Sequence, residues 1–153
     1  MRNYKQGIFR PQNPDKYKGD TNNIVYRSSW ELVVMKKLDL NKDVIEWSSE
    51  ETVIPYYSEV DKKYRRYFVD FTVKVKQKDN SIKKFLIEVK PFKQTVPPKP
   101  RKRKTRQLIN EEIEYIRNQN KWQAAKAWAK HNGYEFMILT ENTKAKNDNQ
   151  KFN

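Results

Sequence analysis

The sequence predicts a single α/β domain with a mixed central β-sheet flanked by helices. Residues 67–75 and 83–90 alternate apolar and polar side chains with the period of a strand. The short turn at 78–81 between them indicates an antiparallel hairpin. We expect a helix over about 108–131, of which residues 122–129 have high helix propensity, and the apolar run 134–140 follows it. Because a strand–helix–strand passage favours a parallel neighbour, we expect parallel and antiparallel pairs in one sheet.

The N-terminal half supplies a helix and two further strands. The helix is expected to begin at Ser28 or Ser29, either of which could be its N-cap, and to end near Asn41. Residues 44–47 and 52–57 are short β-branched and aromatic runs, which is typical of strands. We therefore expect one helix and two short strands in this half of the chain.

We expect three parts along the chain. Residues 1–25 are polar and rich in turn formers, which predicts an extended N-terminal arm with little regular structure. Residues 26–141 form the core, whose C-terminal helix is expected to break near 118–120, and 142–153 form a flexible polar tail. Within the core, residues 93–106 hold seven basic residues, three prolines and no acid. Such a segment cannot pack a core, so it is predicted to be a mobile loop.

Charge and composition narrow the classes of partner and metal. The chain has 33 Lys and Arg against 19 Asp and Glu, a formal net charge of +14, which favours nucleic acid first and an anionic membrane surface second. No apolar run approaches the length of a spanning helix, so we expect no membrane partner. No secretory signal is present, so we expect a protein that is not secreted. Without cysteine and with one histidine, any metal would have oxygen ligands, which points to Mg²⁺ or Mn²⁺.

Acidic and basic side chains in the hairpin suggest a metal-dependent site. Asp70 and Glu88 face the same side if their strands pair, and Lys90 follows Glu88 on that side. Both carboxylates, the Val89 carbonyl, waters and a phosphate oxygen could hold a divalent cation that lowers the pKa of a bound water. Lys90 would orient or deprotonate that water, or stabilise charge on the phosphate. Glu31, on the core-facing side of its helix, could complete the cluster directly or through a water.

Less specific interpretations of the same residues remain open. The acids and Lys90 could form a surface salt-bridge cluster, and Glu31 could simply stabilise the N-terminus of its own helix. The basic segment could be only solubilising, but we expect it to leave the strand beside the site and contact DNA phosphates, largely without sequence preference. Arg27 is a further candidate phosphate clamp. The candidate DNA-binding residues are therefore Arg27, Lys93, Lys99, Arg101, Lys102, Arg103, Lys104 and Arg106.

Two short motifs resemble those of the PD-(D/E)xK nuclease superfamily. Val69-Asp70 stands in the place of its first half, with valine where proline is common, and Glu88-Val89-Lys90 matches its second half. Glu31 matches the glutamate that many members place on their first core helix. The Trp- and Ala-rich helix, Gly133 and the strand closing at Thr140-Glu141 resemble TnsA-type transposon endonucleases.

A longer series of motifs resembles the T4-type phage head-completion nucleases over most of the chain. It comprises Gly7 to Pro11, Lys16 to Asp20, Tyr26 to Glu31, and Glu88 to Pro91 followed by Pro97-Pro98. The resemblance implies a restriction-endonuclease-like core and magnesium-dependent cleavage of DNA. It also implies action on packaged DNA or its end late in head assembly, in the virion or the host-cell cytoplasm, with portal or neck proteins as possible partners.

Two other functions stay open at this point. One is a non-catalytic DNA-binding structural protein, such as a plug at a phage portal or neck. The other is a TnsA-like transposon endonuclease, which would need a transposase partner and cleave at element ends. Metal-dependent cleavage separates the first of these from a nuclease, and dependence on a transposase separates the second.

Overall fold

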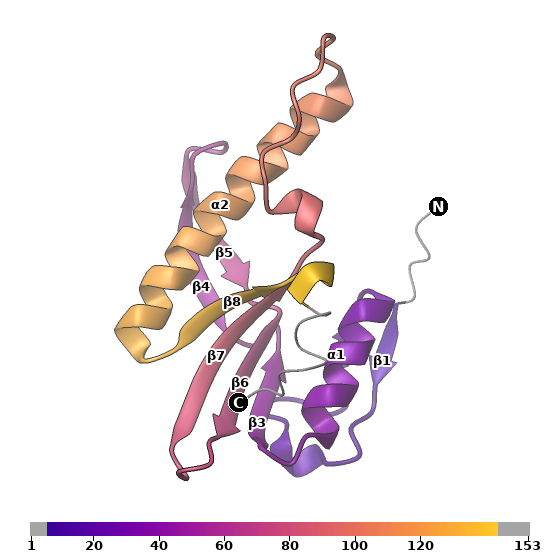
Figure 1. Cartoon of the computed structure of the whole chain (residues 1–153), viewed down its shortest axis with the longest axis vertical. Coiled ribbons are helices and arrows are strands. Elements are labelled where there is room, and N and C mark those ends of the chain that lie inside the picture. The colour runs from indigo at the N-terminus through magenta and orange to yellow at the C-terminus, as the bar shows by residue number, and fades with distance from the viewer. Residues whose placement is uncertain (1–5, 144–153) are drawn as a thin grey trace.

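The computed structural model describes residues 6–143, and Figure 1 shows how its elements are arranged. In chain order they are β1 (Gly7–Phe9), the 3-10 helix η1 (Pro14–Lys16), β2 (Ile24–Tyr26), α1 (Ser29–Leu40), β3 (Val44–Ser49), β4 (Val53–Ser58), β5 (Lys63–Phe68), β6 (Phe71–Lys76), β7 (Ile82–Val89), the 3-10 helix η2 (Phe92–Gln94), α2 (Arg106–Asn132) and β8 (Glu135–Leu139).

A four-stranded mixed sheet forms the centre of the molecule. Its strand order is β3-β6-β7-β8, with β3–β6 and β6–β7 antiparallel and β7–β8 parallel. This confirms the predicted hairpin and the parallel neighbour supplied by the final strand. Two smaller antiparallel sheets, β1–β2 and β4–β5, stand beside it.

Both faces of the central sheet are covered, so its strands carry apolar side chains on both sides. On one face α1 packs Val34, Met35 and Leu38 against a cluster that includes Trp47 and Ile87. On the other face α2 packs against a second cluster. In Figure 1 α1 lies beside β3, whereas the long α2 crosses in front of β4 and β5. The second cluster contains Ile54, Tyr56, Tyr67, Val69, Leu86, Trp122, Ala125 and Ala129.

The break expected in the C-terminal helix is absent. α2 runs without interruption from Arg106 to Asn132 and ends at Gly133, whose φ of 77° allows the left-handed C-cap. Asn118 is buried, and the Asn120 side chain accepts a hydrogen bond of 3.0 Å from the backbone N–H of Glu59. The prediction was wrong because these asparagines are used in tertiary contacts that local propensity does not register.

The strand expected over residues 67–75 is divided between two sheets. β5 pairs with β4 and ends at Phe68, while β6 begins at Phe71 and joins the central sheet. Between them, Val69 N–H donates to the Thr52 carbonyl and the Asp70 carbonyl accepts from Glu50 N–H. The alternation of buried and more exposed side chains continues through the junction, which is why the sequence did not show it. Asp70 therefore lies where the two sheets separate.

The N-terminal arm has more structure than we expected. β1 and β2 pair over three residues each, and the buried rings of Phe9 and Tyr17 lie 5.8 and 4.7 Å from the Trp47 ring. The arm is further held by Asp39, whose carboxylate accepts the backbone N–H of Gln12 at 2.8 Å. Apolar burial therefore fixes this polar segment to the core.

Both ends of the chain extend past the described residues. The prediction of a flexible tail at 142–153 lies outside them, apart from residues 142 and 143, which belong to a helical turn. Across residues 6–143, no helix combines the length and the apolar character needed to cross a membrane.

Candidate active site

Asp70 and Glu88 come together where β6 and β7 pair. Phe71 lies opposite Ile87 in the antiparallel register, so the next residues outward, Asp70 and Glu88, face each other on the side of the sheet that α2 covers. Glu88 is buried, with 5% of its surface exposed. An acid at this depth needs a partner, because isolated buried charge is costly.

The Asp70 carboxylate is held by the neighbouring strand. Its Oδ2 accepts the backbone N–H of Val89 at 2.8 Å. Burial raises the pKa of Asp70 well above its usual range, and the nearby charges of Glu88 and Glu31 raise it further, against the opposing effects of the Val89 N–H and Lys90. Burial and the neighbouring carboxylates therefore oppose ionisation of Asp70 more than the Val89 N–H and Lys90 favour it.

Glu88 has two partners. The Tyr67 hydroxyl donates to its Oε2 at 2.6 Å, and the Lys90 Nζ lies 3.3 Å from its Oε1. Burial and the charge of Glu88 raise the pKa of Tyr67, so the phenol keeps its proton and remains a donor. The backbone N–H of Lys90 donates to the Leu139 carbonyl at 2.9 Å, so β8 fixes the strand end that carries the lysine.

Glu31 sits in the first turn of α1 and takes part in capping that helix. The Ser28 Oγ accepts the Glu31 N–H at 3.1 Å and donates to its Oε2 at 3.2 Å, which identifies Ser28 as the N-cap. Burial raises the pKa of Glu31, with a smaller contribution from the charge of Glu50. The Glu31 carboxylate thus holds the hydroxyl of the Ser28 cap, while its charge also contributes to the raised pKa of Asp70.

These residues suit a hard divalent cation with an incomplete set of protein ligands. Within residues 6–143, no three acidic or histidine side chains gather closely enough to hold a metal ion by themselves. Asp70 and Glu88 supply carboxylate oxygens, the donors that Mg²⁺ and Mn²⁺ prefer, and Mg²⁺ commonly keeps several waters. In a strand the N–H and C=O of one residue point to the same side, so the Val89 carbonyl faces the edge where Asp70 lies.

Comparison with known proteins agrees with this arrangement. Residues 41–141 match the family described as TnsA-like endonuclease N terminal. The chain belongs to the TnsA-like endonuclease family. It is also 42% identical over 139 residues to the head completion nuclease of Enterobacteria phage T4, covering 88% of this chain and 90% of that protein. No solved structure matches it.

Membership of the TnsA-like endonuclease family fits the restriction-endonuclease-like mixed sheet and supports nuclease activity with DNA as the substrate. The matched range contains Asp70, Glu88 and Lys90, whereas Glu31 lies before it. The match to the phage nuclease is longer, because it covers 88% of this chain.

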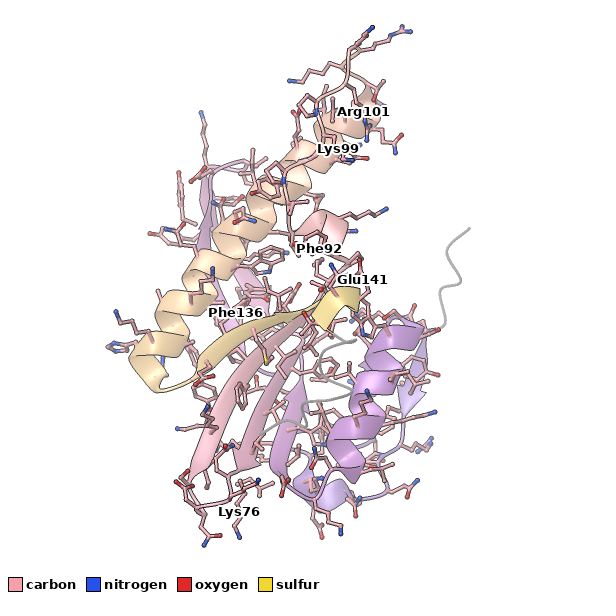
Figure 2. The ribbon with its side chains drawn as sticks, in the orientation of Figure 1. Lys76, Phe92, Lys99, Arg101, Phe136 and Glu141 are labelled. Carbon is pink, nitrogen blue, oxygen red and sulfur yellow. The ribbon has the colours of Figure 1, made fainter. Side chains whose placement is uncertain are left out.

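The basic segment starts near the site but does not stay there. Phe92 N–H donates to both carboxylate oxygens of Glu141, at 3.1 and 3.0 Å, and Lys93 follows in η2. From there the chain extends to the far N-terminal end of α2, where Figure 2 shows Lys99 and Arg101 well away from Phe92 and Glu141. The segment therefore leaves the strand beside the carboxylates, as expected, but Lys99 and Arg101 lie away from them.

Several of the basic side chains have acidic partners. Arg27 makes a two-pronged contact with Glu50, at 2.9 Å from Nε and 3.1 Å from Nη2. At the end of α2, Arg101 lies 3.0 Å from Glu111. Lys104 lies 3.5 Å from the Glu112 carboxylate. These exposed pairs are weak and can exchange for phosphate.

Two contributors to the site were not found from the sequence. Tyr67 was expected only as one residue of an alternating strand, whereas its hydroxyl donates to the Glu88 carboxylate. Glu50 gave no signal, because it follows β3 with a φ of 55° and reaches Arg27 across the arm. Unbroken alternation from Tyr67 to Val75 places Tyr67 on the face opposite Asp70, so the local pattern identifies neither the contact of Tyr67 with Glu88 nor that of Glu50 with Arg27.

Proposed function

We propose that this protein is a metal-dependent DNA nuclease in which Asp70, Glu88 and the Val89 carbonyl bind Mg²⁺ or Mn²⁺. The observation that carries the proposal is the pair of facing carboxylates, Glu88 buried and Asp70 partly buried, with Lys90 3.3 Å from Glu88. A bound cation would polarise the scissile phosphate and lower the pKa of a water. Glu31 belongs to the outer part of the site and acts through a water, because its carboxylate is already engaged by Ser28.

The protein's own groups have separate tasks in this reaction. The Val89 N–H keeps one Asp70 oxygen fixed, and the Tyr67 hydroxyl orients Glu88. If Glu88 binds a cation, Lys90 would no longer be held by that carboxylate. Its ammonium group would then be available to stabilise negative charge that develops on the phosphate. Orientation by such neighbouring groups commonly contributes about 10- to 100-fold in metal affinity or activity.

The biological setting follows from the phage relative. We propose that the protein acts in head completion on packaged DNA or its end, within the virion or the host cytoplasm, and that portal or neck proteins are its partners. The name of the T4 protein, head completion nuclease, supports this setting. Sequence-independent cleavage would suit a substrate defined by its location.

Plasmid nicking tests the catalytic assignment. The wild-type protein is expected to nick supercoiled DNA with Mg²⁺ or Mn²⁺ and to lose this activity in a chelator. Glu88→Gln and Lys90→Met should abolish nicking while DNA binding is retained. Glu46→Gln is the matched control. Glu46 also forms an ion pair with a lysine, since its carboxylate lies 3.1 Å from Lys74 Nζ, but this pair is outside the site.

Equal nicking by wild type and Glu88→Gln would reject the assignment. DNA binding without any metal-dependent cleavage would instead favour the non-catalytic portal or neck plug. Cleavage that requires an added transposase would favour the transposon-type subunit. Each outcome therefore selects one of the three functions.

Contact between the basic residues and DNA is a separate part of the proposal. The end of α2 presents Lys99, Arg101, Lys102, Arg103, Lys104 and Arg106, and Lys93 and Arg27 lie nearer the carboxylates. The segment connects η2 to the distant start of α2, so deleting it would disturb the fold. Its basic residues should instead be replaced by neutral ones. Neutralising the α2 end is expected to weaken DNA binding and to flatten its dependence on salt. An unchanged salt slope would show that these side chains do not contact phosphate.

A further inference from the structure

The outward face of the β4–β5 sheet is exposed, aromatic and basic. Three cross-strand pairs form it, and all six side chains point away from the core. Tyr64 is 76% exposed, Tyr57 47% and Phe68 45%. We refer to this surface as the β4–β5 outer face; its pairs are Val53 with Phe68, Pro55 with Arg66, and Tyr57 with Tyr64.

Packing of the fold does not require these apolar groups. The opposite side of the same two strands buries Ile54, Tyr56 and Tyr67 against α2. The core is therefore complete without the β4–β5 outer face. Adjoining exposed apolar side chains that serve no packing role commonly mark a binding surface.

The chemistry of the β4–β5 outer face suits unpaired nucleotides. None of its six side chains is acidic. The Arg66 guanidinium lies 5.5 Å from the centre of the Phe68 ring, and the rings of Tyr57 and Tyr64 are 5.3 Å apart. Aromatic rings and guanidinium planes stack on bases that have left a duplex, and nearby positive charge attracts the phosphates.

The β4–β5 outer face also leads to the proposed catalytic carboxylates. Phe68 at its edge is two residues before Asp70 in the chain. Tyr67, the residue just before Phe68, points to the opposite side of the hairpin and donates to Glu88. A strand whose bases lie on the outer face would thus have its backbone close to the junction that holds Asp70.

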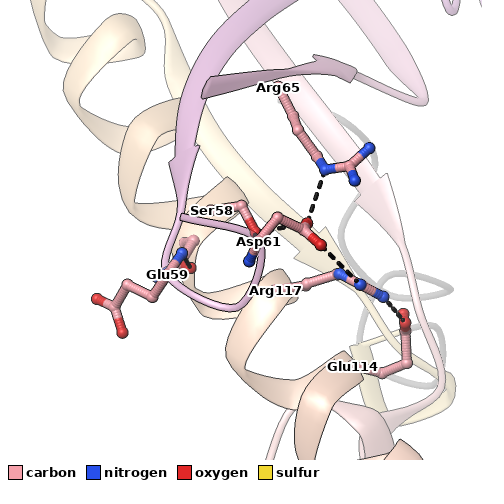
Figure 3. A network of polar contacts seen from close by, with 7 residues as sticks. Ser58, Glu59, Asp61, Arg65, Glu114 and Arg117 are labelled. Atoms are coloured by element: carbon pink, nitrogen blue, oxygen red, sulfur yellow. Dashed lines mark hydrogen bonds and ion pairs between the residues drawn. The ribbon is translucent and has the colours of Figure 1, made fainter. Parts of the chain in front are cut away.

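Polar contacts hold the far end of this hairpin in place. Asp61, in the turn between β4 and β5, accepts from Ser58 at 2.8 Å and from Arg65 at 2.7 Å. Arg117 of α2 lies 3.3 Å from Asp61 and 2.8 Å from Glu114 (Figure 3). The hairpin is therefore fixed to α2, and a preformed surface loses less entropy when it binds a ligand.

We propose that the β4–β5 outer face binds unpaired nucleotides of the DNA strand next to the scissile phosphate. The preferred substrate would then be DNA with a single-stranded end or branch beside the cleaved bond. This inference rests on the proposed nuclease function and specifies its substrate. Protein partners also use aromatic residues and arginine, but the continuity with Asp70 favours the nucleic acid.

Binding measured without metal tests this proposal independently of cleavage. Wild-type protein in a chelator is titrated into fluorescein-labelled oligothymidine of about 16 nucleotides, enough for one site. A blunt hairpin duplex is titrated in parallel at the same salt concentration. The variants are Tyr64→Ala and Phe68→Ala, with Tyr64→Phe as the ring-retaining control. Ile82→Ala serves as a second control, because Ile82 is 52% exposed at the start of β7.

Each alanine variant is expected to lose at least about fivefold in affinity for oligothymidine, the lower end for one stacked base. Duplex affinity and both controls should stay within about twofold of wild type, which is normal for a surface change. Unchanged oligothymidine affinity in Tyr64→Ala would overturn the proposal, as would equal losses on single- and double-stranded DNA. If Tyr64→Ala changes the sedimentation coefficient of the protein but not its affinity for oligothymidine, the proposal is also overturned. The outer face would then bind a second copy of the protein.

The two proposals fail in distinguishable ways. If the outer face binds oligothymidine as expected but no variant or wild-type protein nicks DNA, the nuclease assignment fails and the binding surface stands. If Glu88-dependent nicking is found and the alanine variants bind normally, only the single-strand surface is rejected. Tyr64 carries the test if Phe68→Ala proves unstable, because Tyr64 makes little contact with the core.

Discussion

Replacing Tyr67 by phenylalanine tests the hydrogen bond that positions Glu88. The change removes one hydroxyl and keeps the ring in the α2-side core. The lost contact is buried, 2.6 Å long and made to a carboxylate. Hydrogen bonds to charged groups contribute about 1.5–3 kcal/mol. Lys90 still contacts the other Glu88 oxygen at 3.3 Å, so the lower part of that range, about 2 kcal/mol, is expected.

For a protein of this size, that loss corresponds to a fall in Tm of about 4–8 °C, which thermal unfolding without metal would detect. Nicking by Tyr67→Phe should also fall by about 10- to 100-fold, because Glu88 loses the group that orients it. Tyr64→Phe is the control, since its exposed hydroxyl should be worth less than about 0.5 kcal/mol. If Tyr67→Phe and Tyr64→Phe melt at the same temperature, the argument for Tyr67 as a positioning residue is refuted.

Three further predictions concern charges and a helix cap. Burial raises the pKa of Asp70, so the free energy of unfolding falls as pH rises from the usual aspartate range through the raised pKa. Without metal, Asp70→Asn should therefore melt at a higher temperature than wild type at neutral pH, and the difference in Tm should disappear in acid. Ser28→Ala should lower the free energy of unfolding by about 1 kcal/mol in denaturant titrations, and Ser28→Thr should recover most of it; no loss would contradict the capping role. Hydrogen bonds from Ser58 and Arg65 lower the pKa of Asp61 from 3.8 to about 2. Asp61→Asn should therefore be less stable than wild type at neutral pH, and the two proteins should become equally stable as pH falls from 3.8 through about 2. A difference in stability that persists in acid would contradict this origin.

Local periodicity predicted much of the fold correctly. The bounds of α1 and the antiparallel hairpin follow from residues close together in the chain. The same holds for the Gly133 cap and the parallel final strand. The juxtaposition of Asp70, Glu88 and Lys90 was predictable for the same reason. A strand has a period of two, so a hairpin in the correct register brings alternate residues to one face.

Other features depended on partners that are distant in the sequence. α2 continues through Asn120 because its amide bonds the β4–β5 turn, 61 positions away. The chain leaves one sheet and enters another between Phe68 and Phe71, where both sheets keep the same alternation.

The sequence by itself determined the elements, the charge of the protein and the pair of carboxylates. Only the tertiary structure decided their surroundings: that Tyr67 rather than solvent satisfies Glu88, that Glu50 engages Arg27, and that the basic segment is carried to the end of α2. The physical reason is that periodicity fixes which way a side chain points, whereas burial, pKa and pairing depend on what the rest of the chain brings next to it.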